Sequence, residues 1–487
     1  MGGNMKKVLA IDLGASSGRG IVFESDGKSM NYFEMHRFDN NGVMVDGTLR
    51  WDIHKIFAEI VTCIELCTAR GIHLDSVGID TWGVDYGIVG LDGKVKEMPY
   101  HYRDSRTAGC IDKQEIYSKR QMFDMAGISL GEFNTSYQLI AQQKTAPLKD
   151  TDTLLYIPYL LGYMLTGKLG CDSTIASTSA FYRDGYDKDF LSKLGLLSSN
   201  FAPVSPVGTL LGNIHPRIAK LCKLDYELPV IMTCGHDTAC AIMTVMDGEH
   251  PLYISSGTWS LFGTLVDEPI TSDIAFDEGY TNELGFGDKV TLLKNIMGMW
   301  IIQECRREWQ KEKDISWDDI VEKCKKADKF KGFINVGDSL FNPPYHMDER
   351  IVEYVNKTQN IKLGNIGEIA RCFYNSLAME YRYALDGLKN ITKREYDTLH
   401  IIGGGTRNGL LNQLVADCLN IKVVGGCVEA TAIGNALGQL YGLGVVTNVQ
   451  EIYELSQHTF EPVVYMPTKD RKEWDTQYAK YLQLKNN

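Results

Sequence analysis

Asp237 is the carboxylate of this sequence whose surroundings best suit the handling of a proton. It lies in LPVIMTCGHDTACAIMTV (228–245), where an apolar stretch typical of a strand passes through a glycine into a helical pattern. Phosphoryl transfer to a hydroxyl needs a group that accepts the hydroxyl proton, and an aspartate at this position can accept it. The same position also suits an ordinary helix N-cap, so the spacing by itself leaves both roles open.

Two glycine-rich turns each follow a short apolar strand and could bind phosphate oxygens. They are IDLGASSGRG (11–20) and ISSGTWSLFG (254–263). Small residues in a tight turn leave backbone N–H groups accessible, which is the geometry that binds phosphate. Arg19 could add a cation, and Asp12 at the strand end could orient a hydrated Mg²⁺. A plain hairpin with glycines at positive φ would give the same pattern.

A third glycine-rich segment, IIGGGTRNGLLNQLVADCL (401–419), has two possible functions. Gly403, Gly405 and Gly409 form a looser variant of the dinucleotide-binding fingerprint. That fingerprint needs an acidic residue about 20 positions further on, at the end of the next strand. Glu429 lies further away, after two more glycines and at the start of a helix. The segment therefore fits better as a surface for the base and ribose of a nucleotide.

The segment DTWGVD (80–85) places a tryptophan and two acids around Gly83. A tryptophan can stack on one face of a sugar while carboxylates bind its hydroxyls. A strand followed by an ordinary loop is the alternative.

The elements that carry these segments follow an order that is used twice. The first ninety residues predict three strands, a helix from about Asp52 to Arg70 and a fourth strand at 76–80. A similar order returns after about residue 250. The first strand-glycine turns of the two series are separated by about half of the 487 residues. We therefore expect one fold used twice, with domains at 1–248 and 249–487.

The composition narrows the function classes. The chain has 50 Lys and Arg against 62 Asp and Glu, a net charge of −12, which argues against nucleic-acid binding. Its longest apolar stretch, YIPYLLGYMLTG (156–167), is shorter than the roughly 20 residues that span a bilayer, so no membrane partner is expected. Twelve cysteines without a CxxC pair favour reduced thiols in the cytoplasm over a zinc site. The sequence leaves the oligomeric state undetermined.

Seven segments together resemble the FGGY family of carbohydrate kinases. They are DLGASSGR (12–19), GIDTWGVDYG (78–87), YRDSRT (102–107), GHDTA (235–239), SSGTWSL (255–261), LKNIMG (293–298) and GGG (403–405). The resemblance implies an α/β fold of two actin-like, ribonuclease-H-like domains (a duplicated βββαβαβα) that face each other across a nucleotide-binding cleft.

The same resemblance implies an activity. It is that of an ATP:ketose 1-phosphotransferase that converts L-rhamnulose to L-rhamnulose 1-phosphate in rhamnose catabolism, with ATP as co-substrate and Mg²⁺ as cofactor. Its ligands would be a small sugar and ATP. A kinase for a related deoxyketose such as L-fuculose, and a non-catalytic sugar-sensing protein of the same fold, stay open as alternatives.

Individual roles follow from the resemblance, position by position. Asp237 resembles the catalytic base, and Asp12 the residue that orients Mg²⁺ through water. The residues that match ATP-binding positions are Ala15, Ser16, Ser17, Gly18, Arg19, Thr258, Gln303 and Gly404. Those that match sugar-binding positions are Gly83, His236, Thr238 and Asn295.

One difference within the family bears on the sugar. Glycerol-kinase-like members carry an Arg-Glu pair where this chain has Gly83 and Val84, and a small apolar site suits the methyl group of a 6-deoxy sugar. Burial of one methyl contributes only about 0.8 kcal/mol. Hydrogen bonds from His236, Thr238 and Asn295 to the sugar hydroxyls are therefore expected to give most of the discrimination.

Overall fold

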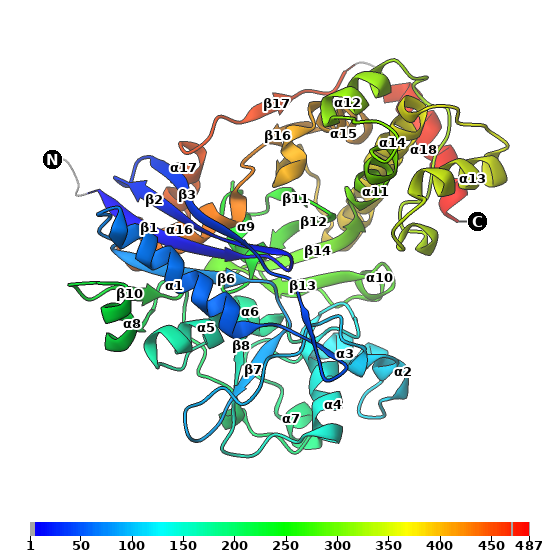
Figure 1. The fold of residues 1–487 in the computed structure, drawn as a ribbon. Coiled ribbons are helices and arrows are strands. Elements are labelled where there is room, and N and C mark those ends of the chain that lie inside the picture. Colours follow the sequence, from blue (N-terminus) through cyan, green and yellow to red (C-terminus); the bar gives the residue numbers. More distant parts are fainter. Residues whose placement is uncertain (1–4, 469–470, 487) are drawn as a thin grey trace. The chain divides into compact units, whose positions relative to one another are not determined.

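The computed structural model describes residues 5–468 and 471–486, which form two compact units (Figure 1). Unit 1 contains the residues up to His250 together with Leu265–Leu292 and Ala430–Glu461. Unit 2 contains Pro251–Thr264, Leu293–Glu429 and the residues from Pro462 onward. The expected boundary at 248/249 stays a prediction, and the chain passes between the units several more times after His250.

Unit 1 is built on a six-stranded sheet with the order β3-β2-β1-β6-β10-β9. Its strands are β1 (Lys6–Leu13), β2 (Ser17–Ser25), β3 (Met30–Asp39), β6 (Ser76–Thr81), β9 (Leu210–Asn213) and β10 (Pro229–Ile231). β1, β2 and β3 are antiparallel neighbours, whereas β1, β6 and β10 run parallel. β6 is buried at every residue, as expected for a central parallel strand, which is covered on both faces.

Helices cover this sheet. α1 (Ile53–Ala69) begins at Asp52, whose carboxylate accepts a hydrogen bond from the backbone N–H of Lys55 at 3.0 Å, and it ends at Arg70 as the sequence pattern predicts. α16 (Ala430–Gly442) packs against β1 and against α9 (Asp237–Met243). The two helices are so close that a Cβ on Gly434 would lie 1.8 Å from the carbonyl oxygen of Cys240.

The other elements of unit 1 are smaller. The strands are β4 (Val43–Val45), β5 (Thr48–Arg50), β7 (Tyr86–Val89) and β8 (Thr153–Tyr156). The helices are α2 (Cys110–Lys113), α3 (Lys119–Ala126), α4 (Thr135–Thr145), α5 (Ile157–Thr166), α6 (Ser173–Ser177), α7 (Lys188–Lys193), α8 (Pro216–Leu221), α10 (Asp273–Asp277) and α17 (Val449–Gln457). Short 3₁₀ turns lie at Ser105–Thr107, Ser198–Asn200 and Phe286–Asp288.

A second sheet has seven strands in the order β13-β14-β12-β11-β15-β16-β17. They are β11 (Leu252–Ser256), β12 (Trp259–Val266), β13 (Tyr280–Leu284), β14 (Val290–Met297), β15 (Thr398–Ile402), β16 (Lys422–Gly425) and β17 (Val463–Tyr465). The helices of unit 2 are α11 (Trp300–Trp309), α12 (Trp317–Lys325), α13 (Met347–Gln359), α14 (Ile366–Thr392), α15 (Gly409–Leu419) and α18 (Arg471–Lys485), with 3₁₀ turns at Ser339–Phe341 and Gly404–Arg407.

The two sheets share a pairing pattern. An antiparallel hairpin, β1–β2 or β11–β12, opens each series, and its first strand then pairs in parallel with β6 or β15. Each hairpin turns at a glycine whose N–H bonds to a carbonyl just beyond the turn, at 2.9 Å for Gly14 and Ser17 and at 2.8 Å for Gly257 and Trp259. The predicted α/β class with a repeated order of strands is confirmed.

No helix within the described ranges is both long and apolar enough to cross a membrane.

Candidate functional site

Three aspartates of unit 1 lie where parallel strands of its sheet end. Asp12 and Asp80 are paired neighbours on β1 and β6, and Asp237 follows β10. The backbone N–H of Thr81 donates to the carbonyl of Gly235 at 2.9 Å, which joins the end of β6 to the segment that carries Asp237. The carboxyl ends of parallel strands are the usual place for ligands in open α/β sheets.

Asp237 is the first residue of α9 and His236 is the N-cap. The capping role that the spacing allowed for Asp237 is therefore wrong. Within the described residues, every hydrogen bond and ion pair of the Asp237 carboxylate involves Oδ1, which accepts from the backbone N–H of Thr238 at 2.6 Å. Burial raises the pKa of Asp237 to about 7, and the nearby carboxylate of Asp12 adds to the shift. A carboxylate with such a pKa is matched to accept a proton at neutral pH.

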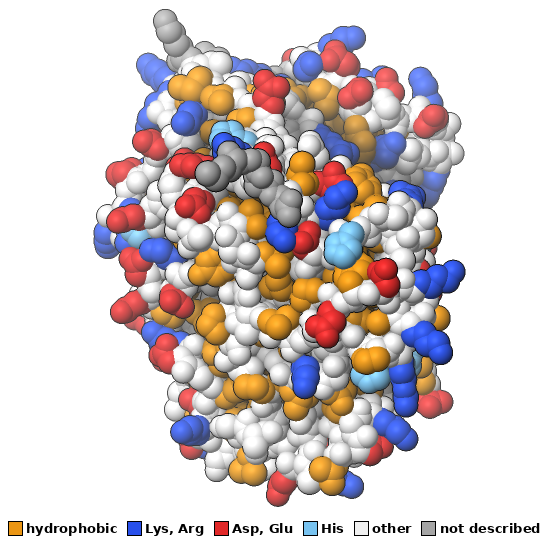
Figure 2. Space-filling model, turned by 90° about the vertical axis from the view of Figure 1, so that its left-hand side faces the viewer, with side chains coloured by type: hydrophobic (Ala, Val, Ile, Leu, Met, Phe, Trp, Pro, Cys, Tyr) orange, Lys and Arg blue, Asp and Glu red, His pale blue; other side chains and the backbone are white. Residues whose placement is uncertain are grey.

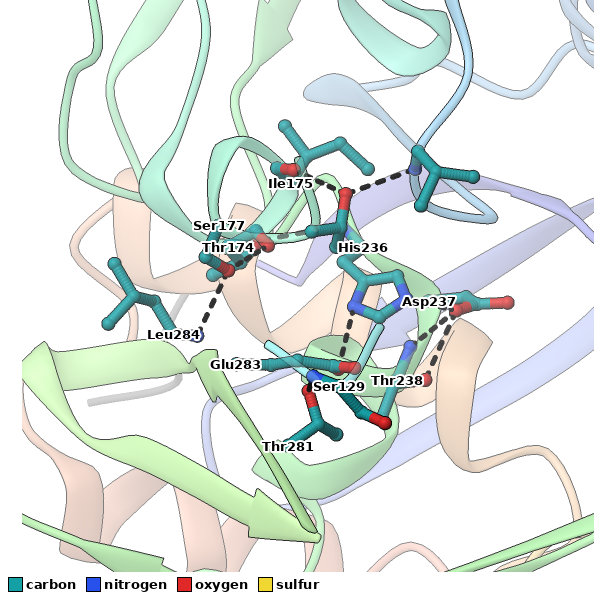
Figure 3. Close-up of polar contacts among 12 residues, drawn as sticks. Ser129, Thr174, Ile175, Ser177, His236, Asp237, Thr238, Thr281, Glu283 and Leu284 are labelled. Atoms are coloured by element: carbon teal, nitrogen blue, oxygen red, sulfur yellow. Dashed lines mark hydrogen bonds and ion pairs between the residues drawn. The ribbon is translucent and has the colours of Figure 1, made fainter. Parts of the chain in front are cut away.

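The imidazole of His236 lies between two carboxylates. Its Nε2 is 3.3 Å from Oδ1 of Asp237 and its Nδ1 is 3.4 Å from Oε2 of Glu283, the contact that a dashed line marks in Figure 3. The His236 side chain is 11% exposed. Burial lowers the pKa of His236, while Glu283 and Asp172 act to raise it.

The segment before His236 is held by a buried aspartate. Oδ2 of Asp172 accepts hydrogen bonds from the backbone N–H of Gly235 at 3.0 Å and from the hydroxyl of Tyr159 at 2.8 Å. A Cβ on Gly235 would lie 2.5 Å from this oxygen, so the close approach requires glycine. Burial raises the pKa of Asp172, and these hydrogen bonds oppose the shift.

The turn after β6 contains a strained residue. Val84 has φ of 68°, a left-handed conformation that costs a β-branched residue about 1–3 kcal/mol. Its N–H donates to the hydroxyl of Thr178 at 3.0 Å, and its carbonyl accepts from Thr135 at 2.6 Å. A Cβ on Gly83 would lie 2.9 Å from Cγ2 of Thr178. The neighbouring side chains therefore fix the turn at Gly83 and Val84.

The two acids of the DTWGVD segment do not face a ligand, which corrects the expectation that they bind sugar hydroxyls. Asp80 is fully buried and accepts a hydrogen bond from Asn435 at 2.7 Å. Asp85 is also buried, and its carboxylate accepts from Trp51, Trp82, Gln138 and the backbone N–H of Tyr102. Burial raises the pKa of Asp85 to about 6, although the four hydrogen bonds act to lower it.

Trp82 belongs to the same buried cluster. It is 6% exposed, and its ring centroid lies 4.0 Å from that of Trp51, which in turn stacks on His101. The ring of Trp82, next to Gly83 in the chain, is therefore packed in the interior of unit 1.

Packing explains one glycine of the first glycine-rich turn of unit 1 but not the other. A Cβ on Gly18 would lie 2.4 Å from the ring of Phe38, so packing requires that glycine. Gly14 has no positive φ, and a Cβ there would make only a 3.4 Å contact with the carbonyl of Ser17. The fold does not require a glycine at position 14, and a ligand that needs the space would explain it. Arg19 pairs with Asp12 at 2.7 Å across the hairpin.

The matching residues of unit 2 show a similar pattern. The hydroxyl of Thr258 donates to Gln303 at 3.4 Å, so two predicted ATP-binding residues lie together. Gly257 and Gly404 have no positive φ, and a Cβ on Gly404 would meet no atom within 4 Å. Asn295 is an exposed residue of β14. The structure thus groups Asp12, His236, Asp237 and Thr238 in unit 1 and Thr258 and Gln303 in unit 2, while the binding roles stay predictions.

The donor set bears on a metal ion. Among residues 5–468 and 471–486, no group of three or more His, Cys, Asp or Glu is arranged to hold a metal by itself. The Asp12 carboxylate nevertheless lies near enough to Asp237 to add to the increase in pKa that burial causes there. Oxygen donors suit Mg²⁺, which keeps several of its waters and is usually bound together with phosphates. The residues therefore fit a hydrated cation that arrives with a nucleotide.

Sequence reasoning missed Glu283 and Asp172. Neither lies in a glycine-rich motif, and both reach the GHDTA segment only through the tertiary fold. Glu283 is the one charged residue of the strand YTNEL (280–284), and this is the only local signal for it.

Two family models and several curated proteins are similar to this chain over most of its length. Two models of the FGGY family of carbohydrate kinases match the chain, that of the N-terminal domain at residues 7–244 and that of the C-terminal domain at residues 252–443. A rhamnulokinase of Bacteroides thetaiotaomicron is 36% identical over 98% of each chain. A rhamnulokinase of Bacillus subtilis is 38% identical over 94% of this chain and 95% of its own.

Solved structures show the same fold at low sequence identity. A gluconate kinase from Lactobacillus acidophilus has a TM-score of 0.81 at 16% identity, covering 99% of this chain and 98% of its own. A glycerol kinase from Plasmodium falciparum, solved with ADP, has a TM-score of 0.78 at 15% identity and covers 98% of both chains.

Proposed function

The chain belongs to the FGGY family of carbohydrate kinases, and we propose that it transfers the γ-phosphoryl group of ATP to O1 of L-rhamnulose. The names of its curated relatives support the choice of sugar. The observation that carries the chemistry is Asp237, a carboxylate with a pKa of about 7 at the carboxyl end of the central strands.

Asp237 is the general base of this proposal. The O1–H proton passes to the Asp237 carboxylate while O1 bonds to the γ-phosphorus and the bond from that phosphorus to the bridging oxygen of ADP breaks. Oδ2 is the oxygen we assign to this proton, since the described contacts of the carboxylate all involve Oδ1. The proton then leaves to solvent when the products dissociate.

The nucleotide-binding roles follow from the matching positions. In unit 1 we assign the ATP phosphates to residues 15–19, and in unit 2 we assign contacts with ATP to Thr258, Gln303 and Gly404. Gly14, Gly257 and Gly404 support this assignment, because the fold does not require glycine at any of them. Mg²⁺, oriented through water by Asp12, would neutralise charge on the phosphates.

Sugar recognition is assigned to Gly83, His236, Thr238 and Asn295. His236 and Thr238 flank the base, so hydrogen bonds from them would fix the sugar beside Asp237. Gly83 lies in the turn that Thr178 holds, and Thr178 occupies the space that a Cβ on Gly83 would need, so packing also explains the glycine there.

A panel of acceptors tests the proposal. ADP release is followed with L-rhamnulose, L-fuculose, D-xylulose and glycerol, and the product is identified by phosphorus NMR. We expect the highest kcat/KM with L-rhamnulose and phosphate on O1. A higher kcat/KM with L-fuculose would identify L-fuculose as the substrate instead of L-rhamnulose. No ADP release with any acceptor would favour a sugar-sensing protein.

We also propose a cytoplasmic location, with sugar and ATP as the ligands instead of nucleic acid or membrane. All twelve cysteines are buried, and the described residues contain no disulfide, which suits a reducing compartment. On the face that Figure 2 shows, acidic and basic side chains are interspersed instead of gathering into a basic stripe.

A further inference from the structure

Glu283 approaches the catalytic segment from a strand outside every motif of the sequence. It lies on β13, and its Oε2 is 3.4 Å from Nδ1 of His236. The other nitrogen of the same ring, Nε2, is 3.3 Å from Oδ1 of Asp237. Both are ion-pair contacts, and Nδ1 makes no hydrogen bond with the described residues, so one imidazole lies between Glu283 and the proposed base (Figure 3).

The backbone on both sides of Glu283 is fixed. The N–H of Asn282 donates to the carbonyl of Gly127 at 3.0 Å. The N–H of Leu284 donates to the hydroxyl of Ser177 at 3.0 Å. The backbone is therefore anchored on both sides of Glu283, which fixes the point from which its side chain extends toward His236.

Retaining a carboxylate at this place has a cost. The side chain of Glu283 is 17% exposed. Burial raises the pKa of Glu283, His236 acts to lower it, and the nearby Asp237 adds a smaller increase. In the described part of the chain, His236 is its ion-pair partner, and no lysine or arginine shares that position. Because burial lowers the pKa of His236, this partner is a weak cation, and a buried acid without a strong cationic partner destabilises a fold. Such groups occur where a site needs them.

We propose that Glu283 is a positioning residue for phosphoryl transfer. It holds the His236 ring so that Nε2 faces Oδ1 of Asp237, which leaves Oδ2 of Asp237 for the sugar hydroxyl. The inference rests on the proposed function, since it takes Asp237 as the base. A carboxylate that orients a histidine through its second nitrogen is a general device of enzyme sites.

The charged groups around the His236 ring determine how the activity should depend on pH. His236 is faced by Asp237 from α9, by Glu283 from β13 and by Asp172 from the segment before α6, and Asp12 of β1 faces Asp237. Asp237 raises the pKa of Glu283. Since repulsion between two carboxylates acts on both, a charged Glu283 should in turn favour the protonated form of Asp237. Removal of the Glu283 charge should therefore lower the pKa of the base.

The test compares Glu283→Gln, Glu283→Asp and Thr281→Val in the full chain, with whichever sugar the wild type phosphorylates best. Thr281 is a matched control on the same strand, where its hydroxyl accepts a hydrogen bond from the N–H of Ser129 at 3.1 Å. The readouts are kcat and KM for sugar and for ATP, the pH profile of kcat/KM and the melting temperature.

We expect Glu283→Gln to lower kcat/KM for the sugar roughly tenfold or more, with the KM for ATP unchanged. Its acid limb should move to lower pH. Glu283→Asp keeps the charge and shortens the side chain, so its acid limb should stay in place while kcat falls. Thr281→Val should keep the wild-type kinetics and pH profile even if it melts earlier.

Two results would overturn the inference. One is wild-type kinetics in Glu283→Gln or, if that variant does not fold, in Glu283→Asp. The other is an unmoved acid limb in Glu283→Gln together with equal losses of activity in Thr281→Val. Failure of the proposed function would be seen separately, as wild-type protein without sugar phosphorylation or as an active Asp237→Asn variant.

Discussion

Oδ2 of Asp172 lies 3.0 Å from the backbone nitrogen of Gly235, within the interior of unit 1. Through this contact a buried side chain holds the backbone two residues before the proposed base. The contact explains why position 235 is glycine, and it predicts that Asp172 affects turnover without touching a substrate.

Asp172→Asn should lower both stability and kcat. An asparagine in this place turns an NH₂ group toward some of the donors that the carboxylate now accepts from, and an unsatisfied buried group costs about 1–3 kcal/mol. Chemical denaturation and the ADP-release assay measure the two effects. Tyr159→Phe is the control, since it removes the hydrogen bonds from the Tyr159 hydroxyl to Asp172 and to the carbonyl of Thr233 but leaves Gly235 held. Equal stability and kcat in Asp172→Asn and wild type would contradict the role.

Asp237→Asn should lower kcat by at least about 10²-fold, because an amide cannot accept the hydroxyl proton. The affinity for ATP should stay nearly unchanged, since the assigned ATP contacts come from other residues. Steady-state kinetics and nucleotide titration check both statements. Turnover near the wild-type rate would exclude Asp237 as the base.

The activity should depend on pH through Asp237. Its pKa is raised to about 7, and the base acts only when deprotonated, so kcat/KM should fall about tenfold per unit as pH drops below that value. The raised value also makes the folded state bind this proton more tightly than the unfolded state, whose value lies near 3.8. Stability relative to Asp237→Asn should therefore decrease as pH rises from about 4 to 7. A kcat/KM that is constant from pH 5 to 8 would contradict this.

Substitutions at two adjacent glycines should affect ATP binding and stability separately. Gly404→Ala places a methyl group in open space at a backbone conformation that alanine adopts, so stability should change little. If ATP lies there, its KM should rise several-fold. Gly405→Ala would place a Cβ 2.0 Å from the hydroxyl of Ser256 and should destabilise the protein by more than about 1 kcal/mol. An unchanged KM for ATP in Gly404→Ala would remove that residue from the ATP site.

Local patterns predicted the parts of the site that depend on local geometry. Spacing predicts three elements that the structure confirms. They are the strand that carries Asp12 near its end, the helix that Asp52 caps and the change from strand to helix before Asp237. Partners brought by distant segments could not be found this way. The sequence around Glu283 and Asp172 does not reveal their roles, because these depend on which strands and loops come together in space.

The DTWGVD segment shows the opposite error. Its acids resemble ligand-binding groups in the sequence, yet Trp51 and Gln138, neither of them in the segment, donate to the Asp85 carboxylate. Burial is a property of the whole fold, and spacing alone does not report it.

The return of residues 430–461 to unit 1 has a consequence for how the protein is made. The side chain of Gln439 accepts a buried hydrogen bond from Ser76 at 2.7 Å and donates to the carbonyl of Leu9 at 3.1 Å. Gln439 emerges from the ribosome 363 residues after Ser76. Nascent chains usually fold their N-terminal domain first. In this protein the first strands to be synthesised must wait for one of the last helices before their packing is complete.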